Sequence, residues 1–446
     1  MKSNWQKNPL CFHVQTKSHA IPKKQMQITK TDLLIHSIAM SLGWGLRGTI
    51  GGGSVGAMIP GSMIGLCLAR VIQLPKRQWA IFTAFCAIGF GIGGQETYGQ
   101  TIGLLKSSET AAWGMLGLTI KGAVWGLNAA LMIWIGLQAD RLNPVRKWAG
   151  IVILTIFSIV GWKLVNQPKW IYFSDPVHQP REEVWFGLFL GPFLAGLYFT
   201  ISGKCRNLAS FLVCGFLAGA CGFGLGSIWL LVGFQLPEPY QKGPWWKLME
   251  FSFGAILGLG FALGSRFLRS PESQEDADPV CEPMPRGWVS IMEGSLAVVV
   301  AMVGSYFCPY RLNFSVLVPV MLILISVLPI AGWHLALSFT MIGFFRDVWM
   351  DVCKKWEIQP THWQMIVLIL LVVALIDWFV RRPGFRLRSA FLILTWAAFC
   401  DYLAQFLLLH PRAVGLVPVV FVLETVMVTA LWLRCDHAVN LVLPTD

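Results

Sequence analysis

The sequence predicts an all-α, polytopic transmembrane helical bundle from its composition, its long apolar runs and the placement of its basic residues. Of its 446 residues, 55% are hydrophobic and only 13% are charged. That much apolar surface cannot be buried in one water-soluble core, so we expect the lipid bilayer to be the main partner. The net charge of +12 does not indicate nucleic acid, because Lys and Arg cluster beside the ends of the apolar runs.

The apolar runs predict about 14 membrane spans. They follow a basic tail at residues 1–30, which has no apolar core long enough for a signal peptide. Most of them are close to the ~20 residues that a helix needs to cross the hydrocarbon core. The runs cover residues 31–50, 52–70, 78–105, 111–138, 148–165, 183–201, 208–233, 247–266, 288–307, 313–330, 332–350, 362–380, 387–408 and 413–432.

The basic residues predict the orientation of these spans, because cytoplasmic loops of membrane proteins are enriched in Lys and Arg. Alternate connections are basic: Arg70, Lys76 and Arg77; Arg141, Arg146 and Lys147; Lys204 and Arg206; Arg266 and Arg269; Arg381, Arg382, Arg386 and Arg388; and Arg434. Only Lys354 and Lys355 depart from the pattern. We therefore expect both termini in the cytoplasm, and the membrane to be a bacterial cytoplasmic membrane. Residues 31–70 either span twice, turning at the glycines 51–53, or form a re-entrant hairpin.

An internal echo predicts a repeat. The segment AIGFGIG at residues 87–93 returns as ACGFGLG at 220–226, and residues 122–131 return in similar form at 254–263. In the predicted topology the matched spans run in the same direction, so the repeat is parallel. The alternative is that helices rich in Gly, Ala and Leu resemble one another by composition. The predicted units are a cytoplasmic tail 1–30, a first repeat 31–165, a second repeat 183–307 with a cytoplasmic linker 267–287, a C-terminal bundle 313–432 and a cytoplasmic tail 433–446.

The 11 cysteines and eight histidines are scattered, with no spacing typical of a zinc site or a disulfide framework. Hence we predict no metal and no cofactor.

Arg47 is the first candidate substrate contact. It lies in a glycine-rich break, SLGWGLRGTIGGGSVG, between two apolar runs. A guanidinium beside free backbone NH groups suits a carboxylate, phosphate or sulfate. The alternative is an arginine that extends to the outer headgroups near a tight turn.

The second candidate is the block GIGGQETYGQ at residues 91–100, the only polar block in an apolar run of 28 residues. Its glycines and hydrogen-bonding side chains predict a broken helix that presents Gln95, Glu96, Tyr98 and Gln100 to a cavity. The alternative places the block at the outer membrane surface, where polar groups cost little. The second copy lacks this polar set.

Lys121 and Asn128 are seven residues apart, and so share one face of the next predicted helix. An intramembrane lysine needs a carboxylate or a cavity, and Glu96 is its nearest candidate partner along the chain. Such a pair either couples proton movement to transport or fixes helix packing. The other candidates for proton coupling are carboxylates without an evident local partner, namely Glu293, Asp401 and Glu424. Asp377 is instead expected to pair with Arg381, four residues on.

The strings GWGLRG, GAMIPG and GGQETYGQ, all in the first third of the chain, resemble those of uncharacterised polytopic bacterial membrane proteins. This resemblance implies no activity. Two functions fit the residues. The favoured one is a secondary transporter of a small polar or anionic solute, with no catalytic residues. The alternative is a membrane-embedded transferase for a lipid-linked or phosphate-bearing substrate, in which Glu96 is the general base. We favour transport because the predicted loops are short.

Overall fold

The computed structural model describes residues 28–175, 182–203, 206–268, 287–307, 312–328, 330–409 and 415–440. Within these ranges all regular elements are helices, and no strand is present. Most of the predicted N-terminal tail and of the linker 267–287, and the end of the C-terminal tail, lie outside the described residues.

The first group of helices contains two breaks, at residues 51–52 and 94–98. It comprises α1 (Lys30–Ile50), α2 (Gly53–Val71), α3 (Trp79–Gly93), α4 (Gly99–Gly103) and α5 (Ala111–Leu137).

The second group follows the same order of long and short helices. It comprises α6 (Pro144–Gly161), α7 (Trp185–Gly203), α8 (Arg206–Gly226), α9 (Ile228–Gln235) and α10 (Trp245–Gly264), and a π-helical turn at Trp162–Asn166 extends α6.

The C-terminal group begins after the predicted linker. It comprises α11 (Gly287–Phe307), α12 (Asn313–Val327), α13 (Ala331–Trp333), α14 (Phe339–Lys355), α15 (His362–Arg381), α16 (Leu387–Leu409) and α17 (Leu416–Asn440). Asp377 of α15 forms the expected ion pair with Arg381, at 2.7 Å.

Among the described residues, ten helical segments have the length and hydropathy to cross a membrane. They are α2, α5, α6, α7, α8 with α9, α10, α11, α15, α16 and α17. The chain is therefore a helical integral membrane protein, in agreement with the composition. The fuller count of 14 spans, and the duplication, remain predictions.

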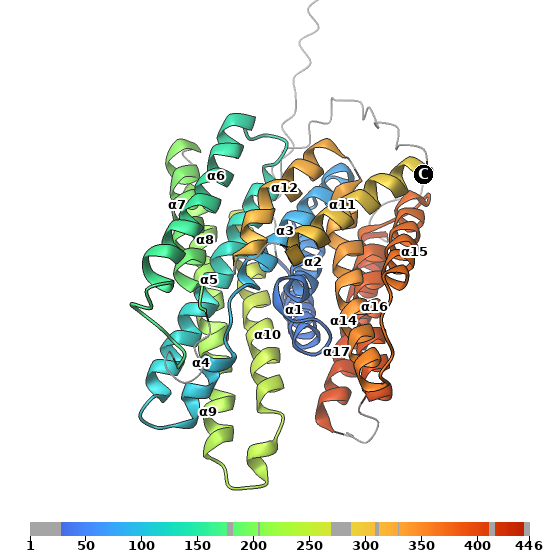
Figure 1. The fold of residues 1–446 in the computed structure, drawn as a ribbon. Helices are drawn as coiled ribbons and strands as arrows, with labels where there is room; N and C mark the ends of the chain where they lie inside the picture. The colour runs from blue at the N-terminus through green and yellow to red at the C-terminus, as the bar shows by residue number, and fades with distance from the viewer. Residues whose placement is uncertain are drawn as a thin grey trace, which may run out of the picture.

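The N-terminal helices occupy the middle of the molecule (Figure 1). Helices α1, α2 and α3 lie between α5–α10 on one side and α14–α17 on the other. Helix α1 packs against α10 and α17, while α3 packs against α2 and α5. The break at residues 94–98 thereby lies among helices of all three groups, whereas Gly52 in the first break is exposed.

Local interactions fix the hairpin of α1 and α2. A capping box begins α1. The Thr29 side chain accepts a hydrogen bond from the backbone N–H of Asp32. In return, the Asp32 carboxylate accepts one from the backbone N–H of Thr29. The same carboxylate pairs with Arg70 at the end of α2. At the other end of the hairpin, Gly53 has φ = 63°, a left-handed conformation that glycine adopts without steric cost.

Helices α5 and α8 meet through two glycine pairs. A methyl group on Gly122 or Gly219 would overlap the backbone of the other residue, and the same is true of Gly126 and Gly215. Each helix therefore uses a G-x-x-x-G spacing, which lets backbones approach closely in membranes. The crossed pairing makes the two helices antiparallel, and Lys121 of α5, next to the Gly122 contact, is completely buried.

We expect Gly126→Ala to destabilise the protein by roughly 1–3 kcal/mol, because the added methyl group forces α5 and α8 apart. The free energy of unfolding in mixed micelles, followed by helical circular dichroism, is the measurement. Gly103→Ala is the matched control, since a methyl group there would meet nothing within 4 Å. Equal stability of the two variants would contradict close packing at this crossing.

Candidate functional site

The helical run that starts with α3 is interrupted at the polar block, as the sequence predicts. Helix α3 ends at Gly93 and α4 begins at Gly99, so residues 94–98 connect them without helical structure. The break is pressed against α2, because a Cβ atom on Gly94 would lie 2.6 Å from the carbonyl oxygen of Gly53 and 2.7 Å from Cα of Ser54. Glycine is therefore needed at the point where the helix stops.

Gln95 ties this break to the C-terminal group. Its Nε2 donates to the Ser315 hydroxyl at 2.6 Å, and its Oε1 accepts from the backbone N–H of Ser315 at 3.1 Å. A third bond, from Nε2 to the carbonyl of Ile92, is 2.9 Å long. The side chain thus holds the start of α12 against the end of α3, and its bonds are to protein groups.

Glu96 meets Lys121, as the sequence predicts, but a third residue completes the cluster. The Lys121 ammonium lies 3.0 Å from Glu96 Oε1 and 2.9 Å from Glu183 Oε1. It also donates to the Thr97 carbonyl at 2.6 Å and to the Thr101 hydroxyl at 2.8 Å. We call Glu96, Lys121 and Glu183 the ion triad. Their side chains are 1%, 0% and 0% exposed, respectively, so water does not screen these charges.

The ion triad has one positive group for two acidic groups. If both carboxyls were ionised, a net negative charge would be buried without compensation, which is costly. The two acids differ in their partners. Glu183 accepts from Lys121, from the Ser174 hydroxyl at 2.6 Å and from the backbone N–H of Phe173 at 3.0 Å. Among the described residues, the Lys121 ammonium is the one charged neighbour of opposite sign that Glu96 has. We infer that Glu96 is the group that holds a proton.

Arg47 lies in an aromatic enclosure at the end of α1. Its guanidinium carbon is 5.0–5.5 Å from the ring centroids of Trp44, Tyr98 and Trp125, within the range of cation–π attraction. Its Nη1 donates to the Tyr98 hydroxyl at 3.0 Å. We call these four residues the arginine cage. Arg47 is 4% exposed, so it does not extend to the headgroups.

The cage is joined to a carboxylate of α10. The Tyr98 hydroxyl donates to Glu250 Oε1 at 3.1 Å, and Trp246 donates to the same oxygen at 2.9 Å. Lys247 pairs with the other oxygen of Glu250 at 2.5 Å. Gly48 makes this approach possible, because a Cβ atom there would overlap the Glu250 carboxylate. Glu96 and Tyr98, two residues apart in one break, thus belong to two different ionic clusters.

The remaining predicted residues lie elsewhere. Asn128 donates to the carbonyls of Val124 at 2.9 Å and Leu188 at 2.8 Å, and so binds α5 to α7. Gln100 is half-buried on α4. Among the described residues, no hydrogen bond or ion pair joins Glu96 to the other proton-coupling candidates, which are half-buried Glu293 on α11, buried Asp401 on α16 and half-buried Glu424 on α17. The Ser41 hydroxyl of α1 donates to Glu424 at 2.6 Å.

Sequence reasoning missed the role of Glu183. It is the first residue of the apolar run at 183–201 and follows two other charged residues, so in sequence it resembles the end of a loop. The available signal was the cost of an intramembrane lysine, which calls for a full search of acidic partners beyond the neighbouring span.

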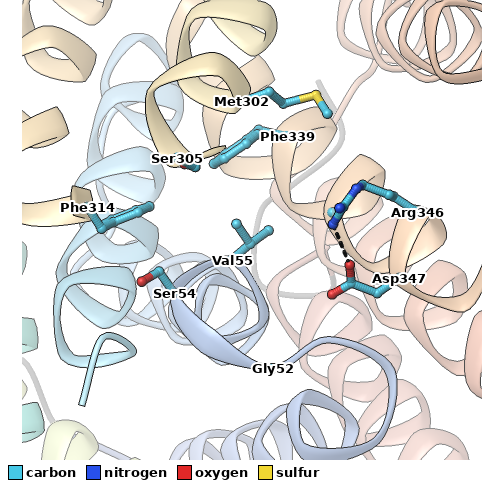
Figure 2. A pocket seen from close by; sticks show the side chains of 10 residues that line it. Gly52, Ser54, Val55, Met302, Ser305, Phe314, Phe339, Arg346 and Asp347 are labelled. Atoms are coloured by element: carbon cyan, nitrogen blue, oxygen red, sulfur yellow. Dashed lines mark hydrogen bonds and ion pairs between the residues drawn. The ribbon is translucent and has the colours of Figure 1, made fainter. Parts of the chain in front are cut away.

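A cavity of about 180 Å³ lies beside the α1–α2 turn, between α2, α11, α12 and α14 (Figure 2). Its lining includes Gly52, Ser54, Phe314, Arg346 and Asp347. None of the residues that sequence reasoning proposed as substrate contacts lines it. Within the described chain, no group of three or more His, Cys, Asp or Glu residues is arranged to hold a metal ion.

Comparison with known proteins found no match for this chain among protein-family models, curated proteins or solved structures.

The ion triad predicts an order of stability among three variants. Lys121→Met leaves two acidic groups facing each other without a counter-charge, so we expect a loss of roughly 3–5 kcal/mol. Glu183→Gln puts an NH₂ group where a carboxylate oxygen accepts from Lys121, Ser174 or Phe173, so it should also destabilise strongly. Glu96→Gln replaces a protonated carboxyl by a neutral amide of the same size, so its cost should be much smaller. Unfolding titrations in micelles give the three values.

If Glu96→Gln proves as damaging as Glu183→Gln, the assignment of the proton to Glu96 is wrong.

Proposed function

We propose that this protein is a secondary transporter of a small polar or anionic solute, coupled to the movement of a proton at Glu96. The observation that carries the proposal is the ion triad at a helix break among apolar helices. Ionisable groups are expensive inside a membrane, and they mark transport pathways and proton relays when they occur there.

The position of the break supports this proposal. Backbone without helical structure is tolerated at membrane depth only where protein or a water-filled cavity surrounds it, and transporters place their sites at such interruptions. Here the break contacts α2, α12 and α5, and through Tyr98 it contacts α1 and α10. Movement of any of these helices therefore changes the surroundings of Glu96.

Transport would require a second conformation, because Glu96 and Arg47 are 3% and 4% exposed here. In the proposed cycle this structure is the closed state. Opening on one side lets water reach Glu96, and the proton leaves. The Lys121 ammonium then stabilises the new carboxylate until a proton returns from the other side.

The finer topology belongs to the same proposal. We propose 14 crossings, built as a parallel repeat plus a C-terminal bundle, in a bacterial cytoplasmic membrane with both termini inside. Supporting observations are the helices that fill each of the 14 apolar runs, and the common order of long and short helices in the first two groups. The antiparallel crossing of α5 and α8 agrees with the opposite directions that this topology assigns to them.

The alternative is a membrane-embedded transferase acting on a lipid-linked or phosphate-bearing substrate. It would need Glu96 and Arg47 to contact one substrate, whereas each is enclosed by its own protein partners. Transport is therefore the better-supported function.

The test uses purified protein in liposomes that contain a pH-sensitive dye. Inorganic phosphate, sulfate, succinate, L-glutamate and L-valine are added one at a time outside. We expect at least one of them to change the internal pH with the wild type. Glu96→Gln should abolish this proton flux, because the amide cannot exchange a proton.

The matched control is Glu238→Gln, which makes the same substitution at a side chain that is 67% exposed, and which should transport normally. Equal proton flux in Glu96→Gln and wild type would eliminate Glu96 as the coupling group. A wild type that moves no proton with any of the five solutes would contradict the proposed function.

A further inference from the structure

The cavity beside the α1–α2 turn has the size of a small-molecule site. Its volume is about 180 Å³. For comparison, a protein cavity of about 150 Å³ holds a benzene molecule. The cavity therefore has room for a solute of a few more atoms than benzene.

One wall of the cavity carries both signs of charge. Arg346 and Asp347 are neighbours on α14, and Arg346 Nη1 lies 2.8 Å from Asp347 Oδ1. Their side chains are 26% and 41% exposed, so neither is sealed off by its partner. A guanidinium has five N–H donors and a carboxylate about four acceptor positions, so each group can bind several partners at once.

The other walls supply apolar surface and hydroxyl groups. Phe314 of α12, Phe339 of α14 and Met302 of α11 line the cavity together with Ser54 of α2 and Ser305 of α11. Figure 2 shows Phe314 and Ser54 on the side away from the charged pair. The site therefore combines a charged end with an apolar end, as small-molecule sites commonly do.

We propose that this cavity binds a small zwitterion of the amino-acid type, with its carboxylate on Arg346, its ammonium on Asp347 and its apolar part against Phe314 and Phe339. The inference rests on the proposed transport function and names the class of solute.

Charge decides between a zwitterion and a simpler ion. A solute with one charge gains one attraction in this site and meets one repulsion, because Arg346 and Asp347 are adjacent. A solute with both charges gains two attractions, and the like-charged groups stay apart. The arrangement therefore discriminates against molecules that lack either charge.

Three molecules of nearly the same shape test this inference. L-Valine carries both charges, isobutylamine is valine without its carboxylate, and isovalerate is valine without its ammonium. Titration calorimetry on the full-length protein in detergent should show binding of L-valine and none of the other two at the same concentrations.

Arg346→Gln and Asp347→Asn should each weaken L-valine binding at least about tenfold, as expected for the loss of a hydrogen bond to a charged group. Both variants should fold, because a partly exposed ion pair contributes little to stability. Lys354→Gln is the matched control, since it removes an exposed charge from the same helix outside the cavity, and its affinity should be unchanged.

Absence of L-valine binding, equal binding of isobutylamine or isovalerate, or unchanged affinity in both variants would each overturn the inference. The outcome is separable from that of the transport test. Binding without proton flux would contradict the proposed function and leave the site standing. Flux with another solute and no L-valine binding would reject the site alone.

Discussion

The ammonium group of Lys121 imposes the main constraint on this structure. It is completely buried, so its charge must be balanced by protein groups at hydrogen-bond distance. Two of these groups, the Thr97 carbonyl and the Glu96 carboxyl, come from the break at residues 94–98. If this segment were helical, its backbone carbonyl could not also bind the lysine of α5. Thr101 of α4 supplies a hydroxyl, and Glu183 comes from the segment before α7. The charge of one lysine thus brings together the break, α5 and the beginning of α7.

Small residues make this arrangement geometrically possible. Gly94 lets the break lie directly on α2, and Gly48 makes room for the Glu250 carboxylate beside α1. Gly93 accommodates the ring of Trp125, which in turn forms one wall of the arginine cage. In a bilayer, where lipid competes for apolar side chains, such close contacts supply much of the packing energy between helices. Gly93 and Gly94 of the polar block therefore serve both the helix break and the packing around it.

The sequence predicts features that depend on neighbouring residues, and misses those that depend on remote ones. A polar block flanked by glycines inside an apolar run predicts the break, and the cost of a buried lysine predicts its pairing with Glu96. Spacing of four predicts the pair of Asp377 and Arg381. By contrast, the partner Glu183 is 62 residues from Lys121, and Glu250 is 152 residues from Tyr98. No periodicity links such positions.

The cavity shows the same limit, because its walls come from helices at both ends of the chain. Arg346 and Asp347 read in sequence as two charges at the end of an apolar run, and only packing places them opposite Ser54 and Phe314. The expected role of Arg47 as a direct substrate contact also depends on packing. Its aromatic enclosure and its bond to Tyr98 place it inside the protein in this conformation.

The central claim is that Glu96 holds a proton in this conformation. Infrared spectroscopy of the purified protein in lipid tests it directly, because a protonated carboxyl has a carbonyl band that is distinct from that of a carboxylate. The band is assigned to glutamate by isotope labelling. Our account predicts a protonated glutamate component that disappears in Glu96→Gln. A protonated glutamate band that is unchanged in Glu96→Gln would contradict the account.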